Sequence, residues 1–194
     1  MLLVNVKEEK RRLRAKYKKL RAQCPQELKR SLDEKLTSMV LGTEEYQSCG
    51  RLFIFVSSPI ECDTSQIIND AFNSGKRVAV PRCGEKPGQM DFYYITSTDD
   101  LEKGAFSLLE PVPERCEKAT DYSSGFCVVP GLCFDLEGYR VGFGKGYYDR
   151  FLDSFKGITA GICYSRYTLK QLPRGTFDRH TDMLITEKFI NRNR

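Results

Sequence analysis

The chain has 194 residues, and its 31 Lys and Arg exceed its 26 Asp and Glu, so its formal charge at pH 7 is +5. Hydrophobic residues make up 40% of the chain, enough for a sizeable core, which excludes a disordered or fibrous protein. No window approaches the ~18 to 20 uninterrupted apolar residues of a membrane helix, and residues 1–10 become charged too soon for a signal peptide. The sequence therefore predicts one domain over residues 1–194, in a cytoplasmic protein with no membrane partner.

Eight cysteines and one histidine restrict the possible chemistry. No CxxC pair occurs, and several cysteines lie within apolar runs such as 126–129, which favours reduced thiols over disulfides. With His180 as the single imidazole and no paired cysteines, a structural zinc site is disfavoured. A Ser-His-Asp or Cys-His catalytic set is disfavoured for the same reason, because it would depend on His180 alone.

The positive charge is concentrated in residues 7–21, which hold nine Lys and Arg against two Glu. The spacing predicts a helix with an apolar stripe of Leu13, Tyr17 and Leu20. A second stripe faces anions and contains Lys7, Lys10, Arg14, Lys18 and Arg21. A solvated charged helix and a basic arm for RNA or membranes are the alternatives. RNA recognition favours exposed aromatic residues among the cations, and Tyr17 lies on the apolar stripe, so we predict no nucleic-acid partner.

Downstream, short apolar runs alternate with helical stretches. The predicted strands are 51–56, 76–81, 90–95, 126–129, 158–163 and 183–186, and the predicted helices are 26–41, 64–73, 146–155 and 168–172. Near-continuous apolar strands separated by helices predict an α/β fold: a mostly parallel sheet with helices on both faces, a Rossmann-like three-layer arrangement. Ligands bind beyond the carboxyl ends of such strands, which directs attention to the loops after Val56, Pro81 and Pro130.

The densest cluster of unusual residues is the stretch 129–150, which has five glycines and three tyrosines ahead of a predicted helix. Glycines allow the backbone to approach a ligand, and a helix N-terminus offers free N–H groups to phosphate, beside the cation Lys145. The stretch is neither a Walker A loop, since Lys145 is followed by Gly146, nor a dinucleotide fingerprint, since position 147 is Tyr. A strand-to-helix turn with incidental glycines is the alternative to a phosphate-binding loop.

The motifs of this stretch resemble those of the 5-formyltetrahydrofolate cyclo-ligase family, also called 5,10-methenyltetrahydrofolate synthetases. The resemblance rests on Val129-Pro130-Gly131 with Phe134-Asp135, and on Gly142-Phe143-Gly144-Lys145-Gly146-Tyr147-Tyr148-Asp149. Weaker matches extend over nearly the whole chain: Lys10-Arg11-x-Leu13-Arg14, Glu61, Val80-Pro81-Arg82, Met90-Asp91, Asp182 and Ile185-Thr186-Glu187.

The resemblance implies an ATP- and magnesium-dependent ligase of folate metabolism. In that reaction the formyl oxygen of 5-formyltetrahydrofolate is phosphorylated, N10 attacks the activated carbon, and phosphate leaves to give 5,10-methenyltetrahydrofolate. It further implies a monomer and a small-molecule substrate that can carry a polyglutamate tail. Phosphoryl transfer needs charge neutralisation and alignment more than a covalent group. Another ATP-dependent phosphotransferase or nucleotide-binding enzyme is the alternative function.

The resemblance also assigns residues to ATP and to the metal. The ATP-binding residues are Lys10, Arg11, Arg14, Arg140, Val141, Gly142, Phe143, Gly144, Lys145, Gly146, Tyr147 and Tyr148, of which Lys145, Arg14 and Tyr147 are the catalytic candidates. Magnesium is assigned to Asp149 and Asp178. On the residues alone, Asp149 equally suits a carboxylate that serves the dipole of a helix first turn. The family often has His before the second Asp, where this chain has Phe177.

The resemblance assigns the folate substrate to residues from separate parts of the chain. They are Val56, Glu61, Met90 and Phe106, together with Phe143, Gly144, Lys145, Gly146 and Tyr147. Glu61 would accept hydrogen bonds from the pterin, and Tyr147 would form an aromatic wall. The alternatives are a solvated loop for Glu61, ordinary core packing for Val56, Met90 and Phe106, and packing at a helix start for the two tyrosines.

Overall fold

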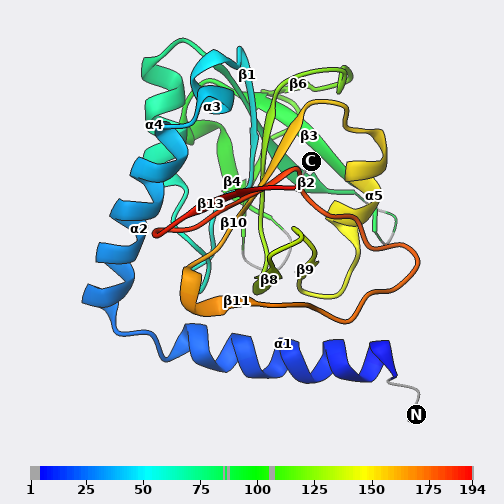
Figure 1. Cartoon of the computed structure of the whole chain (residues 1–194). Coiled ribbons are helices and arrows are strands. Elements are labelled where there is room, and N and C mark those ends of the chain that lie inside the picture. Colours follow the sequence, from blue (N-terminus) through cyan, green and yellow to red (C-terminus); the bar gives the residue numbers. More distant parts are fainter. Residues whose placement is uncertain (1–4, 85, 87, 105–107, 194) are drawn as a thin grey trace.

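The computed structural model of the chain describes residues 5–84, 86, 88–104 and 108–193 (Figure 1). Its helices are α1 (Val6–Ala22), α2 (Gln26–Leu41), α3 (Glu44–Ser48), α4 (Ser65–Asn73) and α5 (Tyr147–Ser154). Its strands are β1 (Arg51–Ile54), β2 (Arg77–Cys83), β3 (Met90–Ile95), β4 (Leu101–Lys103), β5 (Leu109–Pro111), β6 (Glu117–Lys118), β7 (Phe126–Val129), β8 (Cys133–Asp135), β9 (Arg140–Val141), β10 (Ile158–Ile162), β11 (Thr168–Leu169), β12 (Met183–Ile185) and β13 (Ile190–Arg192).

Within the described residues, eight strands form the central sheet in the order β13-β12-β10-β7-β1-β2-β3-β6. The pairs from β12 to β2 are parallel, whereas β13, β3 and β6 join antiparallel at the two edges. All four residues of β7 are buried, as expected for a central strand covered on both faces. The predicted mostly parallel sheet is confirmed.

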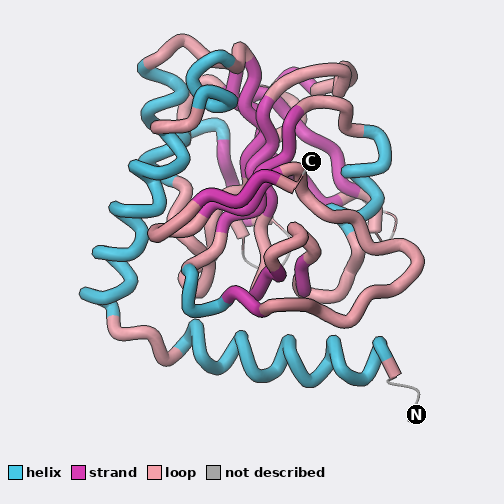
Figure 2. Tube along the Cα trace, in the orientation of Figure 1, coloured by secondary structure: helices cyan, strands magenta, loops and turns pink. Residues whose placement is uncertain are grey.

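The two faces of the sheet carry separate apolar clusters. Successive side chains of a strand point to opposite faces, so Leu52 and Ile54 of β1 pack with α2 and α4, whereas Phe53 packs on the other side. There α5 covers the sheet with Phe151, whose ring lies 4.5 Å from that of Phe92 between centroids. Helices therefore flank both faces, as predicted, with α2 and α4 on one side and α5 on the other (Figures 1 and 2).

The basic helix α1 lies across the carboxyl ends of the parallel strands, along the lower edge of the molecule in Figure 1. The side chain of Asn5 caps its N-terminus by accepting from the Glu8 N–H at 3.2 Å. Leu13 and Tyr17 are buried as predicted, but Leu20 is exposed. Arg21, which we assigned to the anion-facing stripe, is buried instead. Burial of this charge is compensated by hydrogen bonds, because the Arg21 guanidinium donates to the carbonyls of Leu132, Ile60 and Gly131 at 2.8 to 3.1 Å.

The predicted helix 168–172 is wrong. A 3₁₀ turn at Ser165–Tyr167 leads into β11, in which Thr168 and Leu169 pair in parallel with Phe134 and Asp135 of β8. The backbone N–H of Leu172 then donates to the buried Asp135 carboxylate at 3.0 Å. Pairing with a partner distant in sequence therefore outweighs a helical propensity that the following Pro173 already limits.

All eight cysteines lie within the described residues and are free thiols, which confirms the expected absence of disulfides. Burial raises the pKa of Cys62, Cys133 and Cys163 to about 12. These thiols stay protonated at neutral pH and pack as small apolar residues. No helix of the described part of the chain is both long and apolar enough to cross a bilayer.

Candidate functional site

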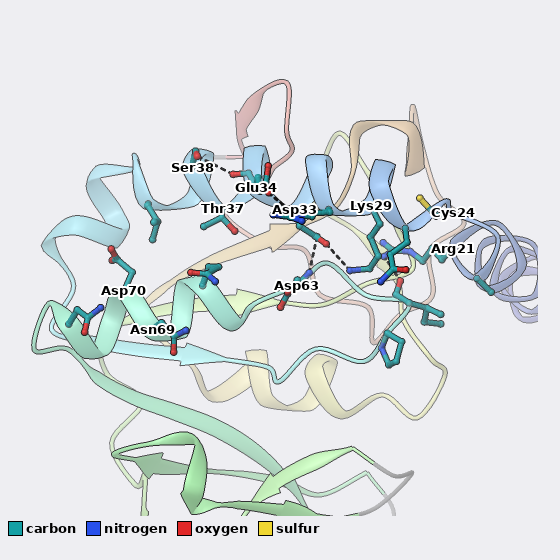
Figure 3. A pocket seen from close by; sticks show the side chains of 18 residues that line it. Arg21, Cys24, Lys29, Asp33, Glu34, Thr37, Ser38, Asp63, Asn69 and Asp70 are labelled. Carbon is teal, nitrogen blue, oxygen red and sulfur yellow. Dashed lines mark hydrogen bonds and ion pairs between the residues drawn. The ribbon is translucent and has the colours of Figure 1, made fainter.

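A pocket of about 1180 Å³ lies between α2, α4 and the loop after β1, and its walls carry polar groups that already have partners (Figure 3). Asp33 accepts from the Lys29 ammonium at 2.7 Å and from the backbone N–H of Asp63 at 2.9 Å. The residues predicted from the sequence to bind ATP, folate or metal are absent from its lining. We therefore locate the candidate site from the side chains themselves.

The glycine-rich segment forms a loop, residues 142–146, between β9 and α5. Gly144 has a φ of +98° and Gly146 a φ of +71°, and both values favour glycine. Gly146 is the N-cap of α5 and provides no side-chain cap, so the N–H groups of the first turn stay available to an anion. Phe143 and Lys145 are exposed on this loop. Val141, which precedes the loop, is not exposed: its side chain is buried in the core, and its carbonyl accepts from the Leu132 N–H.

Helix α1 brings cations to this loop. Arg14 donates from Nε to the carbonyl of Gly142 at 3.1 Å, and a Cβ on Gly144 would lie 3.1 Å from the same Nε. Lys10 pairs with Asp178 in the segment that follows β11. The structure thus places Arg14 beside the glycine loop and Lys10 beside Asp178, and the predicted role of both in ATP binding stays a prediction. Arg11 lies on an exposed face of α1, where it pairs with Glu8 at 2.6 Å.

The predicted metal ligands, Asp149 and Asp178, lie around the buried guanidinium of Arg140. Arg140 donates to Asp149 Oδ1 at 2.9 Å and to the carbonyl of Arg179 at 2.8 Å. Burial lowers the pKa of Arg140, and the neighbouring Asp149 and Asp178 carboxylates oppose that shift. Arg140 therefore faces inward and holds Asp149, whereas Asp178 Oδ2 accepts from Lys10 and from the Gly175 N–H.

The residues predicted to bind folate lie at the ends of the neighbouring strands. Glu61 is 8% exposed, and its Oε2 accepts from the N–H and the hydroxyl of Ser58 at 2.9 and 2.7 Å. Val56 and Met90 are half-buried, and Met90 pairs with Cys83 next to the loop that joins β2 to β3. Burial raises the pKa of Cys83, and the side chain of Tyr147 beside it has the opposite effect. Phe106 lies outside the described residues.

A sequence model of the 5-formyltetrahydrofolate cyclo-ligase family matches residues 6–187. The chain belongs to this family. The 5-formyltetrahydrofolate cyclo-ligase of Mus musculus is 32% identical over 200 residues, which cover 96% of this chain and 98% of the mouse protein. A relative from Arabidopsis thaliana, 31% identical over 79% of this chain and 61% of its own length, is named a mitochondrial enzyme, so the predicted cytoplasmic location stays a prediction.

Two solved structures are similar to this cyclo-ligase family member. The NMR structure of Aquifex aeolicus 5,10-methenyltetrahydrofolate synthetase is 34% identical and has a TM-score of 0.85, with 95% of this chain and 93% of that chain covered. A 5,10-methenyltetrahydrofolate synthetase from Mycoplasma pneumoniae has a TM-score of 0.70 at 20% identity, covering 92% of this chain and 99% of that one, and it supports the fold alone. The predicted family and fold class are both confirmed.

The acidic residues of the candidate site suit a metal ion that takes most of its ligands from phosphate and water. No group of three or more His, Cys, Asp and Glu side chains that could hold a metal occurs in the part of the chain that the structure describes. Asp149 and Asp178 each use one carboxylate oxygen, Oδ1 and Oδ2 respectively, in the hydrogen bonds described above. Magnesium is commonly held by one or two carboxylates with phosphates and water, so this donor set fits it when a nucleotide supplies the phosphates.

Tyr148, in the first turn of α5, has a hydroxyl that is buried without a hydrogen-bond partner among the described residues. Its ring packs against both apolar clusters, at 6.5 Å from Phe92 between centroids, and burial raises its pKa well above the usual range. A buried hydroxyl with no partner destabilises the folded state by its lost hydration.

We therefore expect Tyr148→Phe to leave the melting temperature of the ligand-free protein unchanged or higher. The control is Tyr46→Phe, which removes a hydroxyl that donates to the Asp70 carboxylate at 2.6 Å and should lower the unfolding free energy by about 1.5 to 3 kcal/mol. Thermal and urea unfolding of both variants measure the difference. A lower melting temperature for Tyr148→Phe would mean that its hydroxyl has a partner in solution.

Three polar residues, Arg21, Asp135 and Arg150, hold together the elements around the candidate site in ways that the sequence analysis did not predict. Arg21 fixes α1 to the loops after β1 and β7. The fully buried Asp135 accepts from three backbone N–H groups and from Arg174. Arg150 joins the glycine loop to the β2–β3 loop. The motif contains Asp135 and ends at Asp149, directly before Arg150, yet a motif does not show which distant backbone groups these side chains contact.

Proposed function

We propose that this chain converts 5-formyltetrahydrofolate to 5,10-methenyltetrahydrofolate in a reaction that consumes ATP and forms ADP and phosphate. Family membership supports the folate conversion itself. The observation that carries the use of ATP is the contact of Arg14 from α1 with the glycine loop ahead of α5, with Lys10 one turn earlier on the same helix beside Asp178. Cations and free helix N–H groups around one loop favour a bound polyphosphate.

In this proposal the chain acts by aligning the two substrates and by stabilising charge. Lys145, Arg14 and the first turn of α5 bind the phosphates and stabilise the charge that develops as the γ-phosphoryl group moves to the formyl oxygen. Asp149 and Asp178 would hold magnesium, which neutralises phosphate charge when bound. Glu61 accepts hydrogen bonds from the pterin, and Tyr147 lies as an aromatic wall beside it. No proton has to be removed by a catalytic triad.

The direct test is an absorbance assay for methenyltetrahydrofolate, run with and without ATP and magnesium. We expect methenyltetrahydrofolate to form only when ATP and magnesium are both present, with one ADP formed per turnover. Formation without ATP would contradict the phosphorylation step. Nucleotide cleavage without any change in the folate would favour another ATP-dependent phosphotransferase.

Gel filtration of the same sample tests the proposed monomer. Substrates with one or several glutamates test the use of a polyglutamate tail.

Glu61→Gln is expected to weaken 5-formyltetrahydrofolate binding by about tenfold or more. Charge-assisted hydrogen bonds contribute roughly 1.5 to 3 kcal/mol each, and Gln replaces one acceptor by a donor that faces the ligand's own donors. The amide keeps one oxygen for Ser58, so the melting temperature without folate should stay near wild type.

Calorimetric titrations with folate and with nucleotide on the same protein measure the effect of Glu61→Gln. Glu34→Gln, on the exposed side of α2, is the matched control and should change neither affinity. Unchanged folate affinity, or an equal loss of nucleotide affinity, would show that Glu61 does not anchor the pterin.

A further inference from the structure

The guanidinium of Arg150, on the second turn of α5, lies between two loops that are distant in sequence. Its Nη1 donates to the carbonyl of Lys145 in the glycine loop at 3.0 Å. The same Nη1 lies 3.5 Å from the carbonyl of Gly88, in the loop between β2 and β3. Arg150 is exposed, so the contact is at the surface of the molecule. One side chain therefore links the backbones of both loops.

Two glycines leave space for this guanidinium. A Cβ on Gly88 would lie 2.1 Å from Arg150 Nη1 and 2.5 Å from its Cζ, and a Cβ on Gly146 would lie 3.1 Å from Nη1. Both glycines have positive φ, +83° at Gly88 and +71° at Gly146. Since any side chain at Gly88 would overlap the guanidinium, the position of Arg150 depends on that residue being glycine.

The bond to Lys145 has a consequence for the next amide. In a trans peptide the C=O and N–H groups point in opposite directions, and the described chain contains no cis peptide. Holding the Lys145 carbonyl toward Arg150 therefore turns the Gly146 N–H away from Arg150. Within the described residues this N–H donates to no backbone or side-chain acceptor. It is a free donor at the N-cap of α5, next to the cation of Lys145.

We propose that Arg150 is a positioning residue that fixes the Lys145–Gly146 peptide so that the Gly146 N–H is held toward the nucleotide phosphates. The inference rests on the proposed function, because it takes the glycine loop as the phosphate-binding loop. Arg150 contacts neither substrate. It acts through the peptide, and Gly88 supports it from the opposite side. Without this support the peptide can rotate about the permissive Gly146, and the phosphates lose one hydrogen bond.

The test compares Arg150→Ala, Arg150→Lys and wild type by calorimetric titration with a non-hydrolysable ATP analogue and, separately, with 5-formyltetrahydrofolate. Losing one hydrogen bond to a charged group should weaken the ATP analogue by roughly tenfold in Arg150→Ala. Arg150→Lys should recover part of the loss, because its ammonium can still donate to the Lys145 carbonyl. Folate affinity and melting temperature should stay near wild type, since Arg150 is exposed.

A second variant moves Arg150 without changing it. Gly88→Ala should displace the guanidinium and weaken the ATP analogue, and adding it to Arg150→Ala should produce no further loss. The control is Gly75→Ala, which has a similar φ of +68° but no atom within 4 Å of the added Cβ, so it reports the backbone strain alone. It should leave ATP affinity unchanged.

The outcomes separate this inference from the proposed function. If wild type fails to bind the ATP analogue, the proposed function and the role of Arg150 are both overturned. If wild type binds it and Arg150→Ala binds it equally well, only the role of Arg150 is overturned. An equal loss of folate and nucleotide affinity would also overturn it, because that pattern indicates a general structural role.

Discussion

Lys145→Ala should lower turnover by about 10²- to 10³-fold at subsaturating ATP, with the fold intact. Removing one group that stabilises transition-state charge in a preorganised site typically has an effect of this size. Lys145 is exposed on the glycine loop, and the described residues include no acidic partner for its ammonium, so its removal should leave stability unchanged. The adjacent first turn of α5 alone cannot replace a full positive charge.

Steady-state kinetics over a range of ATP concentrations measure the effect of Lys145→Ala. Lys156→Ala is the matched control, since Lys156 is an exposed lysine beyond the other end of α5, where it donates to the Asp153 carbonyl. Both variants should melt like wild type. Unchanged turnover of Lys145→Ala at low ATP would remove Lys145 from the proposed mechanism.

Asp135→Ala should lower the free energy of unfolding by about 3 to 5 kcal/mol, as breaking a buried ion pair typically does. Asp135 is fully buried and ion-pairs with Arg174 at 3.1 Å. Its Oδ1 accepts from the N–H groups of Glu137 and Tyr139, both at 3.0 Å, and its Oδ2 accepts from that of Leu172. Alanine would leave these donors without an acceptor.

Urea unfolding monitored by circular dichroism measures the effect of Asp135→Ala. Glu137→Ala is the control, because Glu137 pairs with the same Arg174 but is exposed, and such pairs contribute about 0 to 1 kcal/mol. A loss for Asp135→Ala no larger than that of the control would show that the segment 172–178 does not depend on this carboxylate.

The central sheet could be predicted from the sequence because its strands are short apolar runs. A strand buried on both faces needs apolar residues throughout, as 126–129 has, and this local signal does not depend on distant partners. The predictions from sequence were wrong where contacts with residues distant in the sequence determine the local structure. The segment 168–172 pairs with β8 instead of forming a helix, and Arg21 is buried because three carbonyls from other loops surround it.

The candidate site was predicted less completely than the fold. The family motif identified the glycine loop, and helical spacing placed Lys10 and Arg14 on one stripe, of which the structure brings Arg14 to that loop and Lys10 to Asp178. The inward orientation of Arg140 toward Asp149 could not be predicted, since it depends on burial by several elements. The contact of Arg150 with Gly88 could not be predicted either, because it joins residues 62 positions apart.

The exposed ring of Phe143 makes this position of the glycine loop suitable for a fluorescent side chain. The chain has ten tyrosines and no tryptophan, so an introduced tryptophan would be the single indole in the protein, and its emission could be assigned to that position. Phe143 is 43% exposed, with the Lys18 ammonium 5.1 Å from its ring centroid, and tryptophan is the aromatic residue that binds a cation most strongly through its ring. The fluorescence of Phe143→Trp would therefore report on the contact between the glycine loop and Lys18 of α1.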